Sequence, residues 1–527
     1  PWSEGMNVRH LEPLGFIKFD LLGLSTLEMI ESCIKHMLQR EKSIENPTYA
    51  DVAEWYNNNL HPDVLDLEDR NVYKHVFHKG NFVGVFQFTN DGAQKFCKSA
   101  KPNNIIDISA ITSIYRPGPL SAKVDLEYAK AKRNPDGIHY VNDIVKEVTE
   151  ETAGFLIFQE QIALLAHKLG KDINLDEANL LRKLLTKKGT GKGAREKERI
   201  KVKFVQGCVE KGIDRTTADA MWKKFEYFSG YGFNKSHAVS YSILSYQCAW
   251  LYYYYPECWA AAFLDKEPES RKEVAVNLVQ QYGFKVNKVN INRSTQQWEI
   301  AEDNTLVQPL SSIKGLGDKA IEQILNNRPF DTAEGLLFNE GVVYSKLNKK
   351  ALEALCESGA LDSLVDERFT GLKHFAESCI VNRPKTKKKL SQHIEEFKSD
   401  EDYTPEERIE HISSRTGMYP FDLVITREIR DMIDHYKVPP LGSWDQDLKS
   451  AWFIPRSITK RKTKTGREYW IVKVIDETST ISTIRCWGIV PGSDVLHLNR
   501  VYASALQYHP IWGYSTKSIR QNFKLLG

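Results

Sequence analysis

The spacing of apolar residues changes along this chain, and the change limits which folds the chain can adopt. From about residue 80 to 265 the apolar positions follow the periodicity of helices, with breaks at glycine and proline near residues 116–119 and 229–232. Beyond about residue 448 the pattern becomes that of short alternating strands. Three strands are expected, at residues 451–458, 469–475 and 481–487. The sequence therefore predicts a mainly helical protein with a small β domain near its end.

The length of the chain excludes a single hydrophobic core. With 527 residues, we expect three to five domains. The content of 41% hydrophobic and 27% charged residues is typical of a folded, soluble protein. The chain starts at Pro1 without an initiator methionine and enters a helical pattern early. We therefore expect either the middle of a longer protein or a trimmed product.

Two basic runs carry more information than the net charge of +3. Residues 187–203 contain eight basic and two acidic side chains, and residues 459–467 contain five basic and no acidic ones. Such runs suit phosphate backbones, and Lys460, Lys462 and Lys464 of the second run are candidate DNA contacts. A solvated helix face or loop explains each run equally well.

The eight cysteines are scattered and form no C-x-x-C pair. This pattern argues against a disulfide framework or a structural zinc site and favours a reducing cytosol. No uninterrupted apolar stretch of about 18 residues and no signal peptide is visible. The sequence therefore predicts a cytoplasmic protein with no membrane partner.

A carboxylate stands where a short strand is expected to end. Residues 15–19 have the pattern of a strand, Asp20 follows, and the apolar residues from Leu27 to Leu38 then keep helical spacing. A strand that delivers a carboxylate at its end can hold a metal ligand. Aspartate also caps helices well, and taken alone the cap is the simpler interpretation of Asp20.

Two glycines flank one apolar residue within residues 313–321. Between helix-forming segments this pattern is typical of a helix-hairpin-helix element. There Lys314, Gly315 and Gly317 would bring backbone N–H groups close to a phosphate. A helix C-cap followed by a new helix is the alternative.

Six motifs follow one another along the chain. They are KFDLLGL at 18–24, GVFQF at 84–88, YRPGPL at 115–120, FQEQ at 158–161, LRK at 181–183 and FSGYGFNKSH at 228–237. Together with the hairpin and the strands, they resemble the α subunit of bacterial DNA polymerase III, a C-family polymerase. The resemblance implies the rear half of such an enzyme. The expected fold is multidomain and predominantly α, with an α+β palm remnant, a helix-hairpin-helix domain and a C-terminal OB-type β-barrel.

The chemistry implied by the resemblance is nucleotidyl transfer from a dNTP to a primer 3′-hydroxyl. Two Mg²⁺ ions, held by oxygen ligands, would stabilise the attacking and leaving oxygens. Asp20 matches the third catalytic aspartate and metal ligand of the palm. Lys18 matches a palm contact to the substrate phosphate, with a solvated lysine as its alternative. Asp63 and Asp66 have the wrong spacing and position for the other aspartates. We therefore expect inactivity unless an upstream polymerase fragment supplies them.

The resemblance also implies fixed cations around the dNTP triphosphate. Arg182 and Lys183 match adjacent basic residues of a fingers helix, although a lysine lacks the bidentate geometry of an arginine. Arg116 lies in a turn constrained by Pro117 and Pro119, and its alternative is a structural salt bridge.

The last motif implies a loop beside the nascent base pair and the triphosphate. Asn234, Lys235 and His237 are its candidate substrate or template contacts. For His237, a buried and hydrogen-bonded structural role is equally plausible. The tyrosines and the tryptophan of residues 241–255 recur at helical spacing and are expected in the core.

We expect five parts along the chain. They are the end of the palm at 1–50, the fingers at 51–265, a duplex-DNA-binding and clamp-binding domain with the hairpin at 266–380, a linker and helices at 381–447, and an OB-fold domain at 448–527. The linker is expected near residues 380–405, where Pro384 is followed by a lysine cluster and acidic residues.

The expected partners are primer–template DNA, dNTPs, the upstream polymerase fragment and a sliding clamp. The nearest clamp-binding segment, residues 392–397, fits poorly because of its acidic residues and one extra position. A phage-encoded or otherwise divergent member fits these departures. A non-catalytic DNA-binding subunit of a replication complex and an error-prone C-family polymerase stay open as alternatives. Lys18, Asp20 and the basic fingers residues favour a polymerase, since a pure binder needs none of them.

Overall fold

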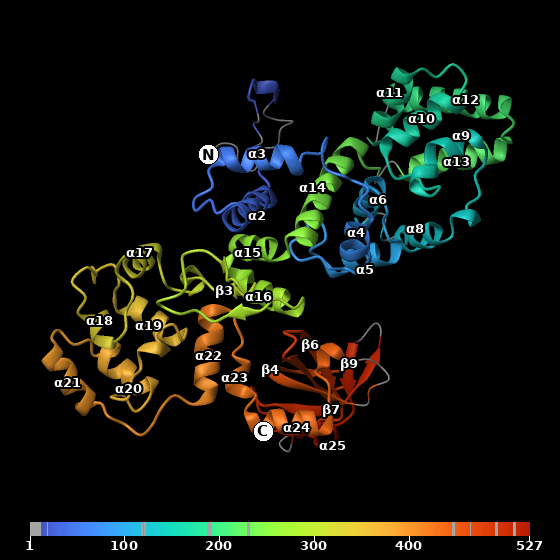
Figure 1. Cartoon of the computed structure of the whole chain (residues 1–527). Helices are drawn as coiled ribbons and strands as arrows, with labels where there is room; N and C mark the ends of the chain where they lie inside the picture. Colours follow the sequence, from blue (N-terminus) through green and yellow to red (C-terminus); the bar gives the residue numbers. More distant parts are fainter. Residues whose placement is uncertain are drawn as a thin grey trace.

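A computed structural model describes most of the chain. The described residues are 12–17, 19, 21–116, 120, 123–186, 192–228, 232–444, 448, 450–463, 465–490, 494–509 and 513–526. Figure 1 shows an elongated arrangement around the long helix α14. A helical lobe (α9–α13) lies at one end, the units that carry α17–α21 lie at the other, and the β domain lies beside them. Among the described residues, no helix combines the length and the apolar character needed to cross a membrane.

The central part is a helical bundle with one large core. Its elements are η1 (Glu12–Leu14), α2 (Ser25–Glu41), α3 (Tyr49–Asn59), α4 (Arg70–Val72), η2 (Tyr73–His78), α5 (Asp91–Ala100), α6 (Ile105–Ile114), α8 (Val124–Arg133), η3 (Pro135–Gly137), α14 (Lys235–Tyr254), α15 (Pro256–Lys266), η5 (Glu269–Arg271) and α16 (Lys272–Gln281). Helix α2 packs into this core through a face that includes Ile30, Ile34 and Leu38, as its spacing predicts. Leu27 is the exception and is exposed. Most of α14 is buried along its length, which explains its many aromatic residues.

The prediction of a strand at residues 15–19 is wrong for the residues of this segment that the structure describes. Gly15, Phe16, Ile17 and Phe19 form a turn and irregular chain, and the three aromatic and aliphatic side chains are exposed. A strand needs a neighbour to satisfy its backbone N–H and C=O groups, and no strand pairs with this segment among the described residues. Lys18 and Asp20 lie outside the described residues.

A separate helical lobe has its own core. Its elements are α9 (Asp143–Thr149), η4 (Glu150–Thr152), α10 (Gln159–Leu169), α11 (Leu175–Thr186), α12 (Lys192–Glu210) and α13 (Arg215–Phe228). Phe204, Trp222 and Phe225 are fully or almost fully buried at its centre. The segment 155–158 enters the lobe from the central bundle, and Ile157 and Phe158 belong to the core of the bundle.

A small three-stranded sheet leads into the hairpin unit. The elements are β1 (Val286–Asn287), β2 (Glu299–Ile300), β3 (Leu306–Val307), η6 (Leu310–Ser312), α17 (Asp318–Asn327), α18 (Ala333–Leu337), α19 (Lys349–Glu357), η7 (Asp362–Leu364), α20 (Leu372–Ala376), η8 (Glu377–Val381) and α21 (Lys387–Glu396). Helix α21 lies in the stretch expected to be a linker. Leu390 and Ile394 are one helical turn apart and pack into the core of this unit, so a helix is the more favourable state there.

The β domain is a curled seven-stranded sheet, as expected for an OB-type fold. Its elements are α22 (Pro405–Thr416), α23 (Phe421–Val424), α24 (Arg427–Tyr436), η9 (Leu441–Ser443), β4 (Ser450–Lys462), β5 (Glu468–Ile475), β6 (Ile481–Cys486), β7 (Tyr502–Ala505), β8 (Gln507–His509), β9 (Gly513–Thr516), α25 (Ile519–Asn522) and β10 (Phe523–Leu525). The strand order is β10-β7-β4-β5-β6-β9-β8, and only β6 and β9 pair in parallel. The three strands predicted from the alternating pattern are confirmed within one or several residues at their ends.

Strand β4 is buried on both faces in its first half, which explains why its first residues do not alternate. Ala451 and Phe453 point into the curled sheet, whereas Trp452 and Ile454 pack against α22–α24. The three helices therefore belong to the same packed body as the sheet.

The contact between α12 and the turn after α10 generates a stability prediction. A Cβ atom at Gly207 would lie 2.3 Å from the carbonyl oxygen of Leu169 and from the amide nitrogen of Lys171. We expect Gly207→Ala to lower the free energy of unfolding by about 1–3 kcal/mol, because backbone on both sides must move. Gly193 lies in the same helix, and its Cβ would make an ordinary 3.4 Å contact with Leu184.

The control variant Gly193→Ala should raise stability by up to about 1 kcal/mol through helix propensity. Urea unfolding followed by circular dichroism measures both. Equal effects of the two substitutions would contradict this account of Gly207.

Candidate nucleotide-binding site

A single β-bridge joins two segments that are far apart in the sequence and begins two helices at the same place. Phe158 and Phe233 pair in parallel, with the amide of Phe233 donating to Ile157 O (3.1 Å) and the amide of Gln159 donating to Phe233 O (2.9 Å). Helix α10 begins at Gln159 and helix α14 at Lys235. The N-termini of both helices therefore meet, and the positive ends of both helix dipoles lie at this place.

The buried side chain of Gln161 fixes this junction. Its Oε1 accepts from the amides of Ile157 (2.8 Å) and Phe158 (2.9 Å), and its Nε2 donates to Val148 O and Thr152 Oγ1. Gln161 is 1% exposed and uses both of its polar atoms. It therefore holds the bridge against the lobe without leaving a buried polar group unsatisfied.

Gln159 attaches a predicted substrate residue to the junction. Arg182 Nη1 on α11 donates to Gln159 Oε1 (2.9 Å), and Gln159 Nε2 donates to Gly232 O (2.6 Å). The guanidinium of Arg182 is thus held beside the loop that precedes α14. Lys183 follows on the same helix and is exposed.

Two glutamates from other elements, Glu160 and Glu151, bond to the first residues of α14. Glu160 accepts from Asn234 Nδ2 (3.0 Å) and from the amide of Lys235 (2.9 Å). Lys235 Nζ lies 2.7 Å from both carboxylate oxygens of Glu151. Asn234 caps the helix, because its Oδ1 accepts from the amide of His237 (2.9 Å). A bound anion would therefore compete with Glu151 for Lys235.

Arg116 reaches the same loop from the end of α6. Its guanidinium lies 3.8 Å above the centre of the Phe233 ring, a cation–π contact. Partial burial lowers the pKa of Arg116 from its usual value, although the group stays charged at neutral pH. The alternative of a structural salt bridge finds no support among the described residues, where Arg116 has no ion pair.

The Phe233 contact continues as a row of rings along α14. The ring centres of Phe233 and His237 lie 5.3 Å apart, and those of His237 and Tyr241 lie 4.3 Å apart. The ring of Tyr241 stacks on that of Phe86, with 5.2 Å between their centres. His237 is exposed, which excludes the buried structural role considered for it. The row ends at Phe86 of the GVFQF motif. Five of the six motifs named above therefore contribute to this site, the exception being KFDLLGL.

Helix α22 is hydrogen-bonded to the hairpin through Arg415. Gly315 has a φ of +95°, a conformation that favours glycine. The amide of Lys314 donates to Arg415 O (2.8 Å), and Arg415 Nη1 donates to Lys314 O (2.8 Å). One amide of the predicted phosphate contact is thus already bonded. Gly317 is the N-cap of α17 and has no atom within 4 Å of its Cβ position, so this side is open.

The basic turn of the β domain borders an aromatic cavity. Lys460 and Lys462 are exposed on β4, whereas Lys464 lies outside the described residues. A cavity of about 910 Å³ is lined by aromatic, basic and polar residues that include Trp444, Tyr469, Arg485, Trp487, Tyr508 and His509. Tyr469 and Trp487 stack at 4.6 Å with an angle of 21° between their planes. The sequence pattern indicated exposed aromatics here but did not place them together.

Comparison with known proteins identifies the family of the chain. The family model of the bacterial DNA polymerase III alpha subunit finger domain matches residues 26–212, and that of the helix-hairpin-helix motif matches residues 283–370. DNA polymerase III subunit alpha of Xylella fastidiosa is 34% identical over 367 residues, which are 68% of this chain and 29% of that protein. The subunit of Halalkalibacterium halodurans is 29% identical over 496 residues, 91% of this chain and 42% of that protein. This chain belongs to the family of bacterial DNA polymerase III alpha subunits.

The chain spans less than half the length of these polymerase III alpha relatives. Within it, the junction of α10 and α14 brings together five predicted residues: Arg116, Arg182, Asn234, Lys235 and His237. Gln159, Glu160 and Glu151 were not predicted as site residues. The FQEQ motif was the available signal for the first two, but their partners are 73–75 residues away in the sequence.

The described part of this polymerase III alpha chain contains no group of three or more His, Cys, Asp or Glu side chains that could hold a metal ion. Asp20 lies outside the described residues.

The hydrogen bonds of Gln161 lead to a prediction about the junction. Gln161→Leu leaves the buried amides of Ile157 and Phe158 without an acceptor, which should lower the free energy of unfolding by roughly 2–4 kcal/mol. Gln206→Leu is the matched control, because Gln206 is exposed and bonds only to Glu210. Urea unfolding measures both variants. A loss below 1 kcal/mol for Gln161→Leu would show that the junction does not depend on this side chain.

Proposed function

We propose that this chain is the dNTP- and DNA-holding part of a DNA-directed DNA polymerase, and that the junction of α10 and α14 binds the triphosphate of the incoming nucleotide. The observation that supports this proposal is the convergence of Arg116, Arg182 and Lys235 on two adjoining helix N-termini. A triphosphate carries nearly four negative charges, and fixed cations near the positive ends of helix dipoles are its natural binding partners.

Each residue has a distinct part in this proposal. Arg182, oriented by Gln159, contacts the triphosphate with a planar pair of donors. Lys235 exchanges Glu151 for a phosphate oxygen when the nucleotide binds. His237 and the rings beside it face the nascent base pair, and Lys183 adds a second cation on α11. The cations bind and orient the triphosphate, so that the leaving pyrophosphate remains neutralised during transfer.

The DNA lies, in this proposal, along the hairpin unit and the β domain. Lys314, Gly315 and Gly317 contact duplex phosphates, and the open side at Gly317 supports that placement. Lys460, Lys462 and Lys464 contact the strand that reaches the β domain, where the stacked rings of Tyr469 and Trp487 support binding of unpaired bases.

Mg²⁺ as cofactor, with Asp20 as one ligand and Lys18 as a phosphate contact, remains a proposal from the resemblance. Two such ions would stabilise the attacking and leaving oxygens. The division into an end of the palm, fingers, hairpin domain and OB domain is proposed, with α21 added to the hairpin domain and α22–α24 added to the OB domain, because they pack into the cores of those units. The cytoplasm of a bacterium is the proposed location.

An upstream polymerase fragment and a sliding clamp are proposed partners. For the clamp, residues 392–397 are the candidate segment, but Ile394 and His393 face the core of the hairpin unit. Gln392, Glu395 and Glu396 are exposed there, and Phe397 is half-buried. Clamp binding through this segment therefore requires α21 to leave its place.

The proposed exchange of Glu151 for phosphate predicts opposite effects of two substitutions. Glu151→Gln should tighten the binding of a fluorescent dNTP about two- to fivefold, because an exposed ion pair no longer competes for Lys235. Arg182→Ala should weaken binding roughly 10- to 100-fold through the loss of charge-assisted hydrogen bonds. Titration of the purified chain measures both.

Glu150→Gln is the matched control, since Glu150 neighbours Glu151 but pairs with Lys146. Unchanged affinity in Arg182→Ala would refute the triphosphate site. A chain that binds DNA but no dNTP would instead support a non-catalytic DNA-binding subunit.

The basic turn of the β domain predicts a salt effect. If its lysines contact phosphates, a variant with Lys460, Lys462 and Lys464 changed to Gln should bind single-stranded DNA with a shallower salt dependence. The slope of log K against log salt should fall by about 2, at about 0.7 for each lost contact. Fluorescence anisotropy between low and moderate salt measures the slope. An unchanged slope would show that this basic run is a solvated loop that does not contact DNA phosphates.

A further inference from the structure

A cavity of about 560 Å³ lies behind the proposed triphosphate site, between the central bundle and the lobe. Its volume falls within the roughly 300–1,000 Å³ of small-molecule sites. None of Arg116, Gln159, Arg182 or residues 232–237 lines it. The cavity is therefore distinct from the site already described, although its residue Phe228 accepts a hydrogen bond from the amide of Gly232 (2.9 Å).

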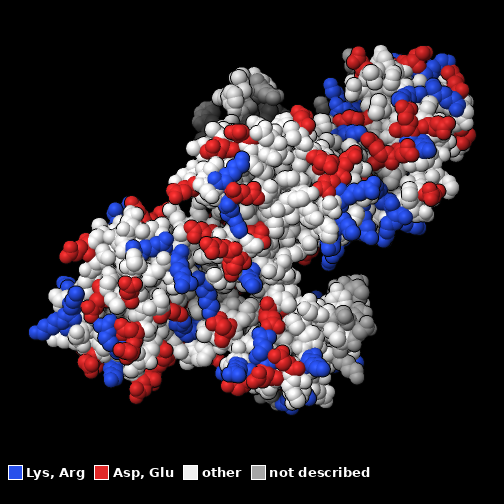
Figure 2. Space-filling model, in the orientation of Figure 1, with Lys and Arg blue, Asp and Glu red and all other residues white. Residues whose placement is uncertain are grey.

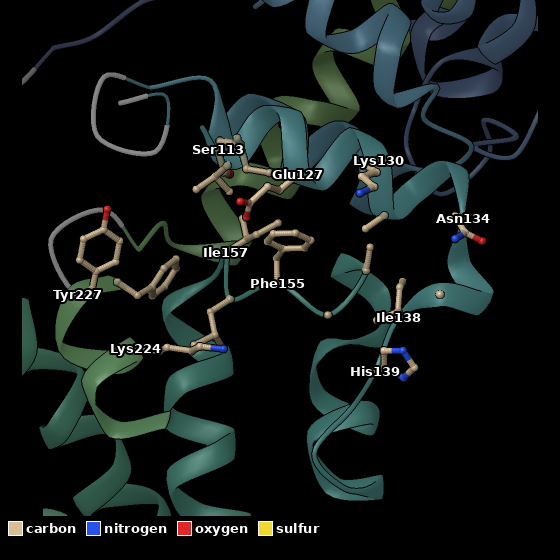
Figure 3. A pocket seen from close by; sticks show the side chains of 18 residues that line it. Ser113, Glu127, Lys130, Asn134, Ile138, His139, Phe155, Ile157, Lys224 and Tyr227 are labelled. Atoms are coloured by element: carbon tan, nitrogen blue, oxygen red, sulfur yellow. The ribbon is translucent and has the colours of Figure 1, made fainter. Parts of the chain in front are cut away.

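The walls of this cavity suit an aromatic ring with an anionic group. Figure 3 shows Phe155 near the centre, with Lys130 of α8 and Lys224 of α13 on different sides of it. The polar part of the lining also includes Glu127, Tyr227, Ser113, Asn134 and His139. The side chains of Lys130, Lys224 and Glu127 are exposed and form no hydrogen bond or ion pair with the described residues. The two lysines can bind phosphate, and the carboxylate can accept from an amino group or a ring N–H of a base.

One side of the cavity continues into a basic surface. Lys130 lies in the last turn of α8 with Arg133, and Lys98 and Lys101 lie at the end of α5. The two helix ends adjoin, because Lys132 of α8 bonds to both oxygens of Asp107 (2.7 and 2.8 Å), whose Oδ2 accepts from the amide of Asn103 just after α5. Figure 2 shows Lys and Arg side chains gathered over α5 and α8.

The cations of this surface have no acidic partner within the part of the fold that the structure describes, although Arg133 Nε donates to Ala129 O (3.1 Å). Lys98, Lys101, Lys130 and Arg133 are all exposed and form no ion pair with the described residues. The chain of Lys98 lies across Gly80, where an added Cβ would be 2.5 Å from Lys98 Cδ. Favourable contact with two helix C-termini accounts for some positive charge here. It does not account for an aromatic cavity with an unpaired carboxylate at the edge of the same surface.

We propose that this cavity and the basic surface of α5 and α8 form a second nucleotide-binding site, which takes one nucleotide of a single DNA strand. The base lies against Phe155, and the phosphates that flank it run along Lys98, Lys101, Lys130 and Arg133. Stacking on an aromatic ring next to a row of cations is the usual way in which proteins hold single strands without sequence preference. The proposal rests on the proposed polymerase function, for which an unpaired template strand is a partner.

Position explains what the site would do. Phe228 borders both the cavity and the loop that leads into α14, so a base in the cavity contacts the support of the triphosphate site. A strand bound here is held by the fingers while its other nucleotides reach the primer terminus. The cavity would thus register whether a template strand is present.

Photochemical crosslinking tests the site directly. The full chain is irradiated with a 20-nucleotide oligothymidine that carries 5-iodouracil, and the modified peptide is mapped by mass spectrometry. The expected adduct is on Phe155 or Tyr227. Phe155→Leu, which keeps an apolar side chain without the ring, should reduce the adduct at least fivefold while circular dichroism shows the same helix content.

A charge series supplies the second readout. The triple variant K98Q/K101Q/R133Q should lower the slope of log K against log salt by about 2 for single-stranded DNA. The control K35Q/K168Q/K171Q removes the same charge from lysines that pair with Glu31, Glu147 and Glu210. It should leave the slope unchanged.

The outcomes separate this site from the proposed function. Oligothymidine binding without an adduct on Phe155 or Tyr227, or with equal slopes in the two triple variants, would overturn the second site and leave the polymerase proposal standing. Competition by free thymidine monophosphate as strong as that by the oligonucleotide would show a mononucleotide site and overturn the strand. No DNA binding at all would overturn both.

Discussion

The bridge between Phe158 and Phe233 is the constraint on which the proposed site depends. It brings together segments 75 residues apart and sets the first residues of α10 and α14. Gln161 makes the bridge possible, because it satisfies two amides that would otherwise be buried without an acceptor. Once the two helix starts are fixed, Gln159 and Glu160 have only one direction in which to reach Arg182 and Asn234. The cations of the site therefore inherit their positions from a neutral, buried side chain.

The site is also a boundary between two cores. Arg182 belongs to the lobe, whose core is built around Trp222 and Phe225, whereas Arg116 belongs to the central bundle. Residues 155–158 connect the two, since Leu156 packs against the core of the lobe and Ile157 and Phe158 belong to the core of the bundle, so a rotation of the lobe about this segment would change the distance between the two guanidinium groups. A triphosphate that binds both would favour one orientation of the lobe. The structure is thus suited to couple nucleotide binding to a movement of the fingers.

The sequence predicted most of the helical part, the strands of the β domain and five members of the site, because these depend on local periodicity and on recognisable motifs. It failed where the deciding contacts are distant. The stretch at 380–405 looked like a linker because its charged residues hide Leu390 and Ile394, which only the hairpin unit buries. Glu151 carries no local signal for its contact with Lys235, 84 residues away. By contrast, His237 and Tyr241 are one turn apart on α14, so the contact between their rings was open to prediction once α14 was assigned.

Helix α22 connects the two parts proposed to hold DNA. At its end, Arg415 bonds to the hairpin at Lys314 and to Glu357 of α19 (2.6 Å). At its start, Glu406 pairs with Arg500 of the β domain (3.0 Å), and Ile409 packs into the core shared with β4. The hairpin cannot present the Lys314 amide to a phosphate without giving up its bond to α22, which would also loosen the hairpin from the β domain. Contact with DNA is therefore easier through the open N-terminus of α17 at Gly317, which leaves α22 in place and keeps the two DNA-binding parts in fixed register.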